Sequence, residues 1–408
     1  MLKKSIFNIS LVSAGNVIGS ILGLILLTAT AKALPLNEFG KYALLTSLLV
    51  SISKIMDFGS NSIFVAESII NGTVVKSSDA KSKFISLKII LFVISLVVSI
   101  PLLLFFKLYT VKLLFLFVLG TIGYLVNYTL FPFFQKDEKY HFTVGLNFLP
   151  AIIKGVFGTL ILLKLIRLDL NIAFSIFSAS LFSSASLFIF MRNEFKNLKV
   201  SFSGLFSDLK LIYPAGISQI INESWMAISN GVIKLSKNFS DVGIFSLANK
   251  VSNAFSLISL SIFTVLLPKN SIRKKHNLKY DLTETAILSC LILLLSLVAI
   301  ASTRYLFPLI FGDKFSQSVL LIDIMILASA FTAIHTFMEN YFFVENQTKL
   351  LLVVSTLKLS IFLTSSALLI PIFSLRGAAY AQLISAFVTL LTTITILTKR
   401  VHLKALRI

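Results

Sequence analysis

The chain has 408 residues, of which 56% are hydrophobic and 13% charged, against about 25% charged in ordinary soluble domains. So few polar residues cannot cover a water-facing surface, which excludes a soluble multidomain protein and predicts that lipid surrounds most of the chain. The net charge of +20 would suit nucleic-acid binding in a soluble protein, but the basic residues lie in short segments between apolar runs, as in membrane proteins.

About twelve apolar runs are each long enough to cross the hydrocarbon core as a helix, which needs about 20 residues. In chain order they are 7–31, 42–64, 84–106, 112–134, 143–164, 171–191, 211–234, 244–267, 285–303, 317–341, 350–371 and 377–398. The first run is longer than the hydrophobic core of a signal peptide, so we expect an uncleaved helix. The runs do not alternate at period two, which argues against β-barrel strands.

The distribution of lysine and arginine predicts the orientation in the membrane. With the N-terminus in the cytoplasm, 21 basic residues fall in cytoplasmic segments and 11 in external ones. The densest cluster, residues 273–275, falls on the cytoplasmic side. Because the cytoplasmic segments of membrane proteins are enriched in lysine and arginine, we expect both termini in the cytoplasm.

An internal repeat predicts two six-helix lobes, residues 1–200 and 201–408. Residues 38–44 and 241–247 share the pattern acidic, apolar, Gly, any, aromatic, small, Leu, at an offset of 203. A weaker echo at an offset of 205 pairs Leu170, Ala173 and Ser180 with Leu375, Ala378 and Ser385. Six spans per lobe is an even number, so the lobes would insert in the same orientation. They would be related by a pseudo-two-fold axis along the membrane normal, as in several secondary transporters.

Four lysines lie inside the predicted spans: Lys54, Lys154, Lys250 and Lys358. A lysine at a helix centre costs about 2.5–3.5 kcal/mol on insertion scales, and a water-filled interior would remove most of that cost. Polar residues share the face of these lysines at helical spacing, among them Asn249 and Asn253 beside Lys250. We therefore predict a cationic cavity shared by both lobes that binds an anionic cargo. The alternatives are pairing with a carboxylate such as Asp57, or snorkelling to the headgroups, which Lys88 and Lys358 could do more readily than Lys54 and Lys154.

Four carboxylates also lie within spans: Asp57, Glu223, Asp323 and Glu339. Such a group can bind Na⁺ or carry a proton, so these residues are candidates for ion coupling; the alternative is a partner that neutralises a nearby lysine. Gly15, Gly19 and Gly23 form a stripe on the first span that predicts close helix packing. The single cysteine, Cys290, and the scattered histidines offer no metal-ligand spacing, and we expect neither a metal site nor a cofactor.

Short segments spread over the chain resemble Wzx-type polysaccharide flippases of the multidrug/oligosaccharidyl-lipid/polysaccharide exporter superfamily. The matching segments are 34–42, 57–59, 134–135, 213–216, 242–248, 311–315, 370–371 and 376–381. Each segment alone is weak, but their order together with twelve spans is fairly specific. The family resemblance does not extend to Lys54, Lys154 and Lys250, whose role rests on the argument from burial.

The resemblance implies a transporter, without a catalytic step, in the bacterial inner membrane. Its cargo would be an undecaprenyl-diphosphate-linked oligosaccharide, moved to the outer leaflet for O-antigen or capsule assembly by alternating access. Its partners would be membrane lipids, a polysaccharide polymerase and a chain-length regulator, with no nucleic acid. Two alternatives remain: a drug/cation antiporter of the same superfamily, whose cavity should favour acids, and a membrane glycan polymerase or ligase, which should need a larger external loop.

Overall fold

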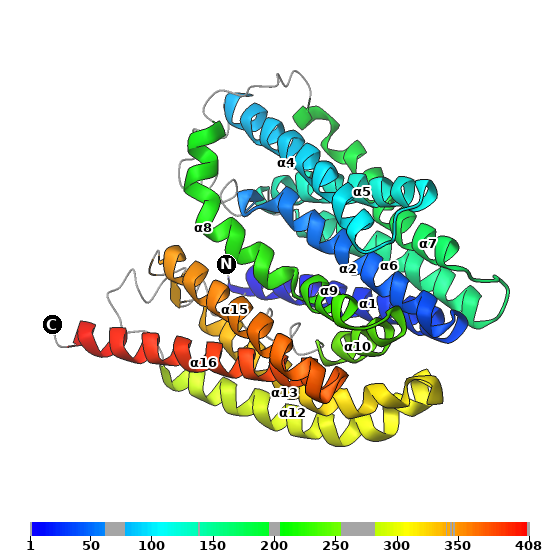
Figure 1. Ribbon diagram of the computed structural model, residues 1–408. Coiled ribbons are helices and arrows are strands. Elements are labelled where there is room, and N and C mark those ends of the chain that lie inside the picture. Colours follow the sequence, from blue (N-terminus) through cyan, green and yellow to red (C-terminus); the bar gives the residue numbers. More distant parts are fainter. Residues whose placement is uncertain are drawn as a thin grey trace. The chain divides into compact units, whose positions relative to one another are not determined.

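A computed structural model of the chain describes residues 2–61, 78–137, 139–195, 205–253 and 282–405, without 340, 343, 344 and 346. Over these residues every regular element is a helix (Figure 1). Nine helical segments among them are long and apolar enough to cross a membrane, and Val17–Ala33 is a shorter apolar helix. The prediction of an all-helical integral membrane protein is confirmed.

The helices follow the predicted spans closely. In the first half they are α1 (Leu2–Ala33), α2 (Leu36–Asp57), α4 (Ser78–Phe105), α5 (Val111–Lys136), α6 (Tyr140–Leu162), α7 (Leu170–Phe182), η1 (Ser183–Phe195) and α8 (Leu205–Glu223). In the second half they are α9 (Trp225–Ser236), α10 (Phe239–Ser252), α12 (Leu282–Phe311), η2 (Asp313–Phe315), α13 (Ser316–Met338), α15 (Thr348–Phe373) and α16 (Leu375–Ala405). The predicted single span 211–234 is broken at Ser224 into α8 and α9. The basic cluster 273–275 and the end of the predicted span 244–267 lie outside the described residues.

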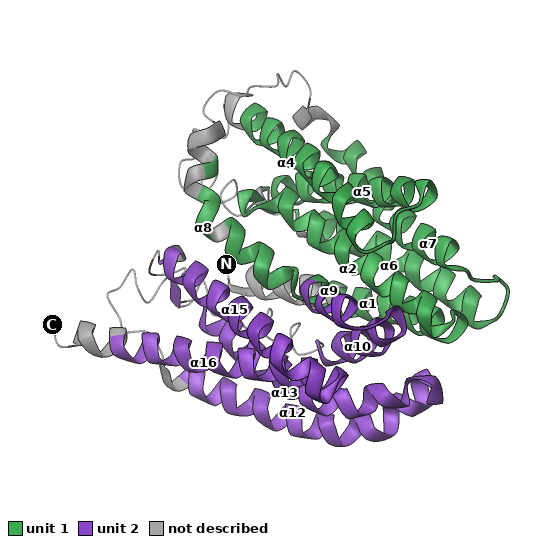
Figure 2. Cartoon of the chain, in the orientation of Figure 1, with its two compact units in different colours: residues 1–227 green, residues 228–408 purple. Residues whose placement is uncertain are grey.

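The chain divides into two compact units, residues 1–227 (unit 1) and residues 228–408 (unit 2) (Figure 2). The sequence places the boundary at residue 200, whereas α8 belongs to unit 1. The reason is a small apolar cluster in which Leu209 and Ile212 of α8 pack against Leu87 and Leu91 of α4, with Phe58 beside them. Unit 1 therefore extends past the predicted boundary and includes α8.

Short polar side chains fix where several helices begin. Thr110 caps α5 by accepting a hydrogen bond from Leu113 N at 3.2 Å. Asp169 caps α7 through Ile172 N at 2.7 Å. Asn238 caps α10 through Asp241 N at 3.0 Å. Each satisfies one of the amides that a helix start leaves without an intrahelical partner.

The internal repeat corresponds to equivalent helix starts. α2 begins at Leu36 and α10 at Phe239, which is the offset of 203 seen in the sequence motif. α7 begins at Leu170 and α16 at Leu375, which is the offset of 205. In the second pair, Ala173 and Ala378 are both fully buried, and so are Ser180 and Ser385. The repeat therefore marks elements with the same boundaries and the same buried face.

Small residues allow α1 to lie against α6. A Cβ added at Gly15 would overlap the side chain of Val144, and one at Gly19 would be in ordinary contact with Ala151. From the other side, a Cβ at Gly158 would lie 2.7 Å from the backbone nitrogen of Leu26. The predicted packing seam is thus present at two of its three glycines, while Gly23 faces open space.

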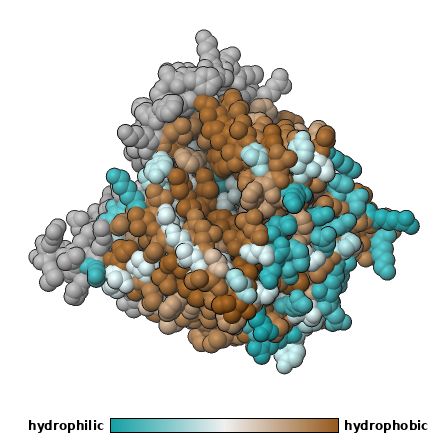
Figure 3. Space-filling view, viewed as in Figure 1, coloured by the Kyte–Doolittle hydropathy of each residue, from teal (hydrophilic) through white to brown (hydrophobic). Residues whose placement is uncertain are grey.

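The surface is largely apolar. Large hydrophobic side chains are exposed on the outward faces of α4, α5 and α12, such as Val97 (64%), Phe115 (67%) and Val298 (63%). In Figure 3, hydrophobic residues cover most of the described surface in view, and hydrophilic ones gather toward its edge. Exposed apolar area on this scale is unfavourable in water and suits contact with lipid.

Candidate functional site: a charged cavity inside unit 1

Unit 1 contains a cavity of about 550 Å³, within the range typical of ligand sites. Eleven of its sixteen lining residues have polar side chains. The polar ones are Lys54, Asp57, Asn61, Tyr124, Asn127, Tyr128, Gln135, Asn147, Lys154, Gln219 and Glu223. A polar cavity among helices with apolar outer faces removes the main cost of placing lysine inside a membrane span.

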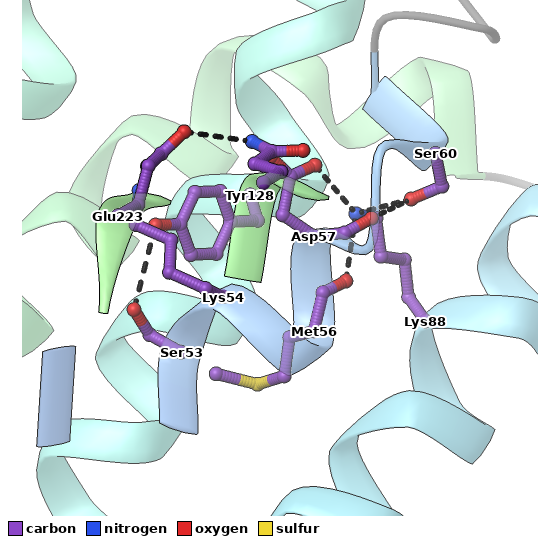
Figure 4. A network of polar contacts seen from close by, with 9 residues as sticks. Ser53, Lys54, Met56, Asp57, Ser60, Lys88, Tyr128 and Glu223 are labelled. Carbon is purple, nitrogen blue, oxygen red and sulfur yellow. Dashed lines mark hydrogen bonds and ion pairs between the residues drawn. The ribbon is translucent and has the colours of Figure 1, made fainter. Parts of the chain in front are cut away.

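Lys54, which lines this cavity, is held by a carboxylate and an aromatic ring. Its ammonium group forms an ion pair with Glu223 and lies 5.2 Å from the centroid of the Tyr128 ring. The Tyr128 hydroxyl is in turn 3.4 Å from Ser53 Oγ (Figure 4). A cation over an aromatic face in a partly desolvated site is stabilised electrostatically. The charge of Lys54 is therefore compensated by groups of the chain itself.

A second lysine, Lys88, lies buried beside the cavity. Its ammonium donates hydrogen bonds to Met56 O at 3.0 Å and Ser60 Oγ at 2.9 Å and lies 3.8 Å from Asp57 Oδ1 (Figure 4). Only 1% of Lys88 is exposed, so of the two alternatives for this lysine the structure shows pairing with Asp57 and not snorkelling. The reason is local: α2 ends at Asp57, so the Met56 carbonyl is one of the orphan acceptors of a helix end and takes the Lys88 ammonium.

The last two turns of α8 tie this network to α2. Gln219 Nε2 donates to Asp57 Oδ2 at 2.8 Å and to Glu223 Oε1 at 3.0 Å, so one amide joins both carboxylates. Beneath them, a Cβ at Gly216 would lie 2.9 Å from the ring and carbonyl of Phe58. Phe58 has φ 42° and Gly59 has φ 72°, which ends α2 and lets α8 approach closely.

Lys154 of α6 lines the same cavity. Lys154 lies in α6 with its ammonium 4.3 Å from the centroid of the Phe177 ring of α7. Asn127 of α5 donates to Leu146 O of α6 at 3.2 Å, which holds the two walls together. Asn61 also lines the cavity; its Oδ1 is buried and has no hydrogen-bond partner among the described residues.

The sequence predicts a cationic cavity, whereas the structure shows one whose charges are nearly balanced. Lys54 and Lys154 line it together with Asp57 and Glu223. If Lys88 is included, three lysines face two carboxylates, a net charge of +1. Within unit 1, two of the predicted ion-coupling carboxylates thus lie among the predicted cargo lysines. The predicted cavity shared with the second lobe stays a prediction.

Three other predicted cargo residues lie at the end of α10 in unit 2, with Asn253 as the residue that follows its last turn. Asn249 is fully buried; it donates to Ser229 Oγ at 3.2 Å and accepts from Gln382 Nε2 at 3.4 Å. Asn253 Oδ1 accepts from Ser329 Oγ at 3.5 Å. These bonds join α10 to α9, α13 and α16, a placement that favours a structural role for both amides. Lys250, between them, is half-buried.

Lys358 and Glu339 belong to a sealed cluster in unit 2. His335 Nε2 lies 3.0 Å from Glu339 Oε1, and His335 Nδ1 lies 3.0 Å from Thr393 Oγ1. Lys358 is 3% exposed, Glu339 8% and His335 2%, and Lys358 interacts electrostatically with Glu339. Pairing of a span lysine with a carboxylate was the alternative to a cargo role for Lys358, and this placement favours it.

Asp323 also has a partner. Its Oδ2 accepts bonds from Arg304 Nε at 3.1 Å and Nη2 at 2.9 Å, which joins α13 to α12. Arg304 is 64% exposed, so this pair lies at the surface of unit 2. Among the described residues, no group of three or more His, Cys, Asp or Glu is placed to hold a metal ion.

The contribution of α5 to the cavity lining was not predicted from the sequence. Tyr124, Asn127 and Tyr128 occur at positions i, i+3 and i+4, and they face the cavity together. Tyr124 and Tyr128 stack with ring centroids 5.9 Å apart. Their shared helical face was readable from the spacing. They lack charge, and charge was the signal used to find the other lining residues.

The structure resembles several solved transporters. Over 95% of this chain and 87% of the other, it matches "Lipid II flippase MurJ, inward closed conformation" with a TM-score of 0.73 and 14% identity. It matches an inward-facing "multidrug resistance MATE family transporter of the MOP superfamily" over 93% and 95% of the two chains, with a TM-score of 0.67 and 14% identity. It matches the "MATE multidrug transporter DinF-BH" over 96% and 95%, with a TM-score of 0.64 and 17% identity. These likenesses show the fold.

The family of this chain follows from comparison of its sequence with family profiles. Comparison with curated protein sequences found no match. The family profile described as "Polysaccharide biosynthesis protein" matches residues 5–272, which is more than half of the chain. The resemblance is confirmed at the level of family and fold: the chain is a multi-pass membrane protein with the same fold as the solved MATE and MurJ proteins, and it belongs to the polysaccharide biosynthesis protein family.

Proposed function

We propose that this protein is a flippase that moves an undecaprenyl-diphosphate-linked oligosaccharide from the cytoplasmic to the outer leaflet of the bacterial inner membrane. The observation that carries the proposal is the position of Lys54 and Lys154 on one polar cavity inside a bundle with apolar outer faces. Ammonium groups form charge-assisted hydrogen bonds with phosphate oxygens. The family and the fold support a transporter of the polysaccharide pathway.

The rest of the lining suits a sugar. Asn61, Asn127, Asn147 and Gln135 offer amide donors and acceptors, and Tyr124 offers a hydroxyl; these are the groups that pair with hydroxyl-rich ligands. The lipid chain would stay in the bilayer while the diphosphate and the first sugars occupy the cavity. Alternating access would then expose the cavity first to the cytoplasm and later to the outer side. We propose that both termini are cytoplasmic and that Na⁺ or H⁺ drives the return.

A cellular experiment tests this function. In cells that depend on this protein for surface glycan, Lys154→Ala should reduce glycan display and cause lipid-linked oligosaccharide to accumulate in the inner leaflet. Loss of one charge-assisted bond is worth about 1.5–3 kcal/mol, so transport should fall about 10- to 100-fold. Lys112→Ala, at the exposed start of α5, is the matched control and should leave transport unchanged. Normal display in Lys154→Ala cells at normal protein level would contradict the proposal.

The carboxylates on the cavity also favour one other cargo. Asp57 and Glu223 would attract an organic cation, as expected for a drug antiporter of this fold. The two functions separate in a binding experiment on the purified protein in nanodiscs. The flippase proposal requires undecaprenyl diphosphate to bind and tetraphenylphosphonium not to compete with it. Binding of the cation alone would support the antiporter.

A further inference from the structure

Lys54 and Glu223 form an ion pair on the wall of the cavity. The role inferred here for Glu223 rests on the proposed function. We propose that Glu223 is an internal counter-ion that occupies the phosphate site on Lys54 while the transporter is empty. The cargo diphosphate would displace it, and the exchange would release the end of α8 from α2. Glu223 is thus a positioning residue that links the arrival of cargo to the movement of one helix.

The first support is the geometry of the pair. The Lys54 ammonium pairs with the Glu223 carboxylate. The Lys54 side chain is 17% exposed, whereas the Glu223 side chain is 41% exposed. The anionic partner is therefore the accessible one, and a phosphate that enters the cavity meets the same face of Lys54. Carboxylate and phosphate oxygens compete for the same ammonium donors.

The second support is the charge balance. Two lysines and two carboxylates line the cavity, so a diphosphate adds negative charge to a site that is already neutralised. If Glu223 stayed in place, like charges would meet close to one ammonium, which is strongly unfavourable in a site of low dielectric constant. If Glu223 leaves, Lys54 exchanges one anionic partner for another and no buried charge is left without compensation.

The third support is the position of Glu223 in its helix. It is the last residue of α8, immediately before the break at Ser224. Two polar links join this end of α8 to α2: the Lys54–Glu223 pair and the Gln219 bond to Asp57. Gln219 also donates to Glu223, so loss of the carboxylate from its site would disturb both links. Pro214 lies two turns upstream in α8 and removes one backbone hydrogen bond there, which lets this end move separately.

The test compares Glu223→Gln with Glu38→Gln, a matched change at the start of α2 outside the cavity lining. The probe is undecaprenyl diphosphate, added to the purified full-length protein in nanodiscs. Removing the competing charge should tighten binding about 10-fold in Glu223→Gln, because one charge-assisted bond no longer has to be broken. Glu38→Gln should bind as the original protein does.

Hydrogen exchange gives a second measurement, which can be made on the original protein as well as on the variant. Addition of undecaprenyl diphosphate to the original protein should increase exchange in the peptide around residues 216–227. In Glu223→Gln the exchange there should already be high without the lipid. Weaker or unchanged binding in Glu223→Gln, or no exchange response in the original protein, would overturn this inference. If Lys154→Ala still weakened binding, the proposed function would stand; if the original protein did not bind the lipid at all, the proposed function itself would fail.

Discussion

Unit 1 and unit 2 both place lysines and carboxylates inside apolar helices, but they use them differently. In unit 1, Lys54 and Glu223 line a cavity of about 550 Å³, and their side chains are 17% and 41% exposed. In unit 2, Lys358 and Glu339 are both buried; the Glu339 side chain is only 11% exposed, and the His335 ring lies against it. One pair faces space that a ligand can occupy, and the other faces protein.

An intramembrane charge is therefore not by itself evidence of a binding site. A buried charge can be retained because a partner compensates it, and removing one partner is then costly for folding. A charge on a cavity wall can instead be exchanged between partners, which is what transport requires.

The largest effect on stability should come from Lys358→Met. It leaves the buried Glu339 carboxylate without the ammonium that compensates it, which should cost about 3 kcal/mol or more. The apparent melting temperature in detergent, measured by fluorescence-detected size exclusion, should fall sharply. The double variant Lys358→Met/Glu339→Gln should recover most of the loss, since it removes both charges. Lys154→Met should melt close to the original protein, and equal losses in both single variants would remove the distinction between the units.

A smaller effect should follow from Gly216→Ala. The new Cβ would lie 2.9 Å from the Phe58 ring and carbonyl, so α8 must shift away from α2 at a cost of about 1–3 kcal/mol. Gly23→Ala is the matched control, because nothing lies within 4 Å of its added Cβ and alanine favours a helix by up to about 1 kcal/mol. The melting temperature should fall in the first variant and rise slightly in the second. A rise in both would mean that α8 and α2 are not closely packed.

Gln219→Ala should cost less, about 1 kcal/mol, because it removes neutral-to-charged hydrogen bonds from a partly accessible site. The loss should be accompanied by faster hydrogen exchange near residue 223, since α8 then has one polar link fewer to α2. Asn127→Ala, on the other side of the cavity, should not change exchange at that position. Unchanged exchange in Gln219→Ala would show that its two bonds do not hold the helix end.

The smallest effect should come from Arg304→Ala. Arg304 is 64% exposed, and exposed ion pairs contribute about 0–1 kcal/mol. The melting temperature should change little, and the small difference should shrink at high salt. A loss as large as that of Lys358→Met would mean that the Arg304–Asp323 pair is part of the interior of unit 2.

The sequence predicts the fold well because hydrophobic length and helix-capping residues are local properties. Asp169 and Asn238 mark helix starts within a few residues of the predicted spans, and the repeat offset of 203 equals the spacing of two helix starts. The break at Ser224 was not predicted, because residues 211–234 together are long enough for one span and contain several polar residues. Nothing in that run identifies which interruption ends a helix.

The site was predictable only in part, since partners come from other helices. Burial identifies Lys54 and Lys154 as candidates, but the pairing of Lys54 with Glu223, 169 positions later in the chain, depends on how α8 packs. Lys88 shows the same limit. Its place near a helix end suggested snorkelling, while the orphan carbonyl of Met56 draws its ammonium inward. Tyr124 and Tyr128 carry no charge, and only the arrangement of helices shows that they line the cavity.

Photo-crosslinking tests most directly whether the cavity of unit 1 holds the cargo diphosphate. The purified protein in nanodiscs is irradiated with undecaprenyl diphosphate that bears a photoreactive group beside the phosphates, and the labelled peptides are mapped by mass spectrometry. We predict labels on α2, α6 and α8 that excess undecaprenyl diphosphate suppresses and undecaprenol does not. Labels confined to α13 and α15, or labels that undecaprenol removes equally well, would contradict the account.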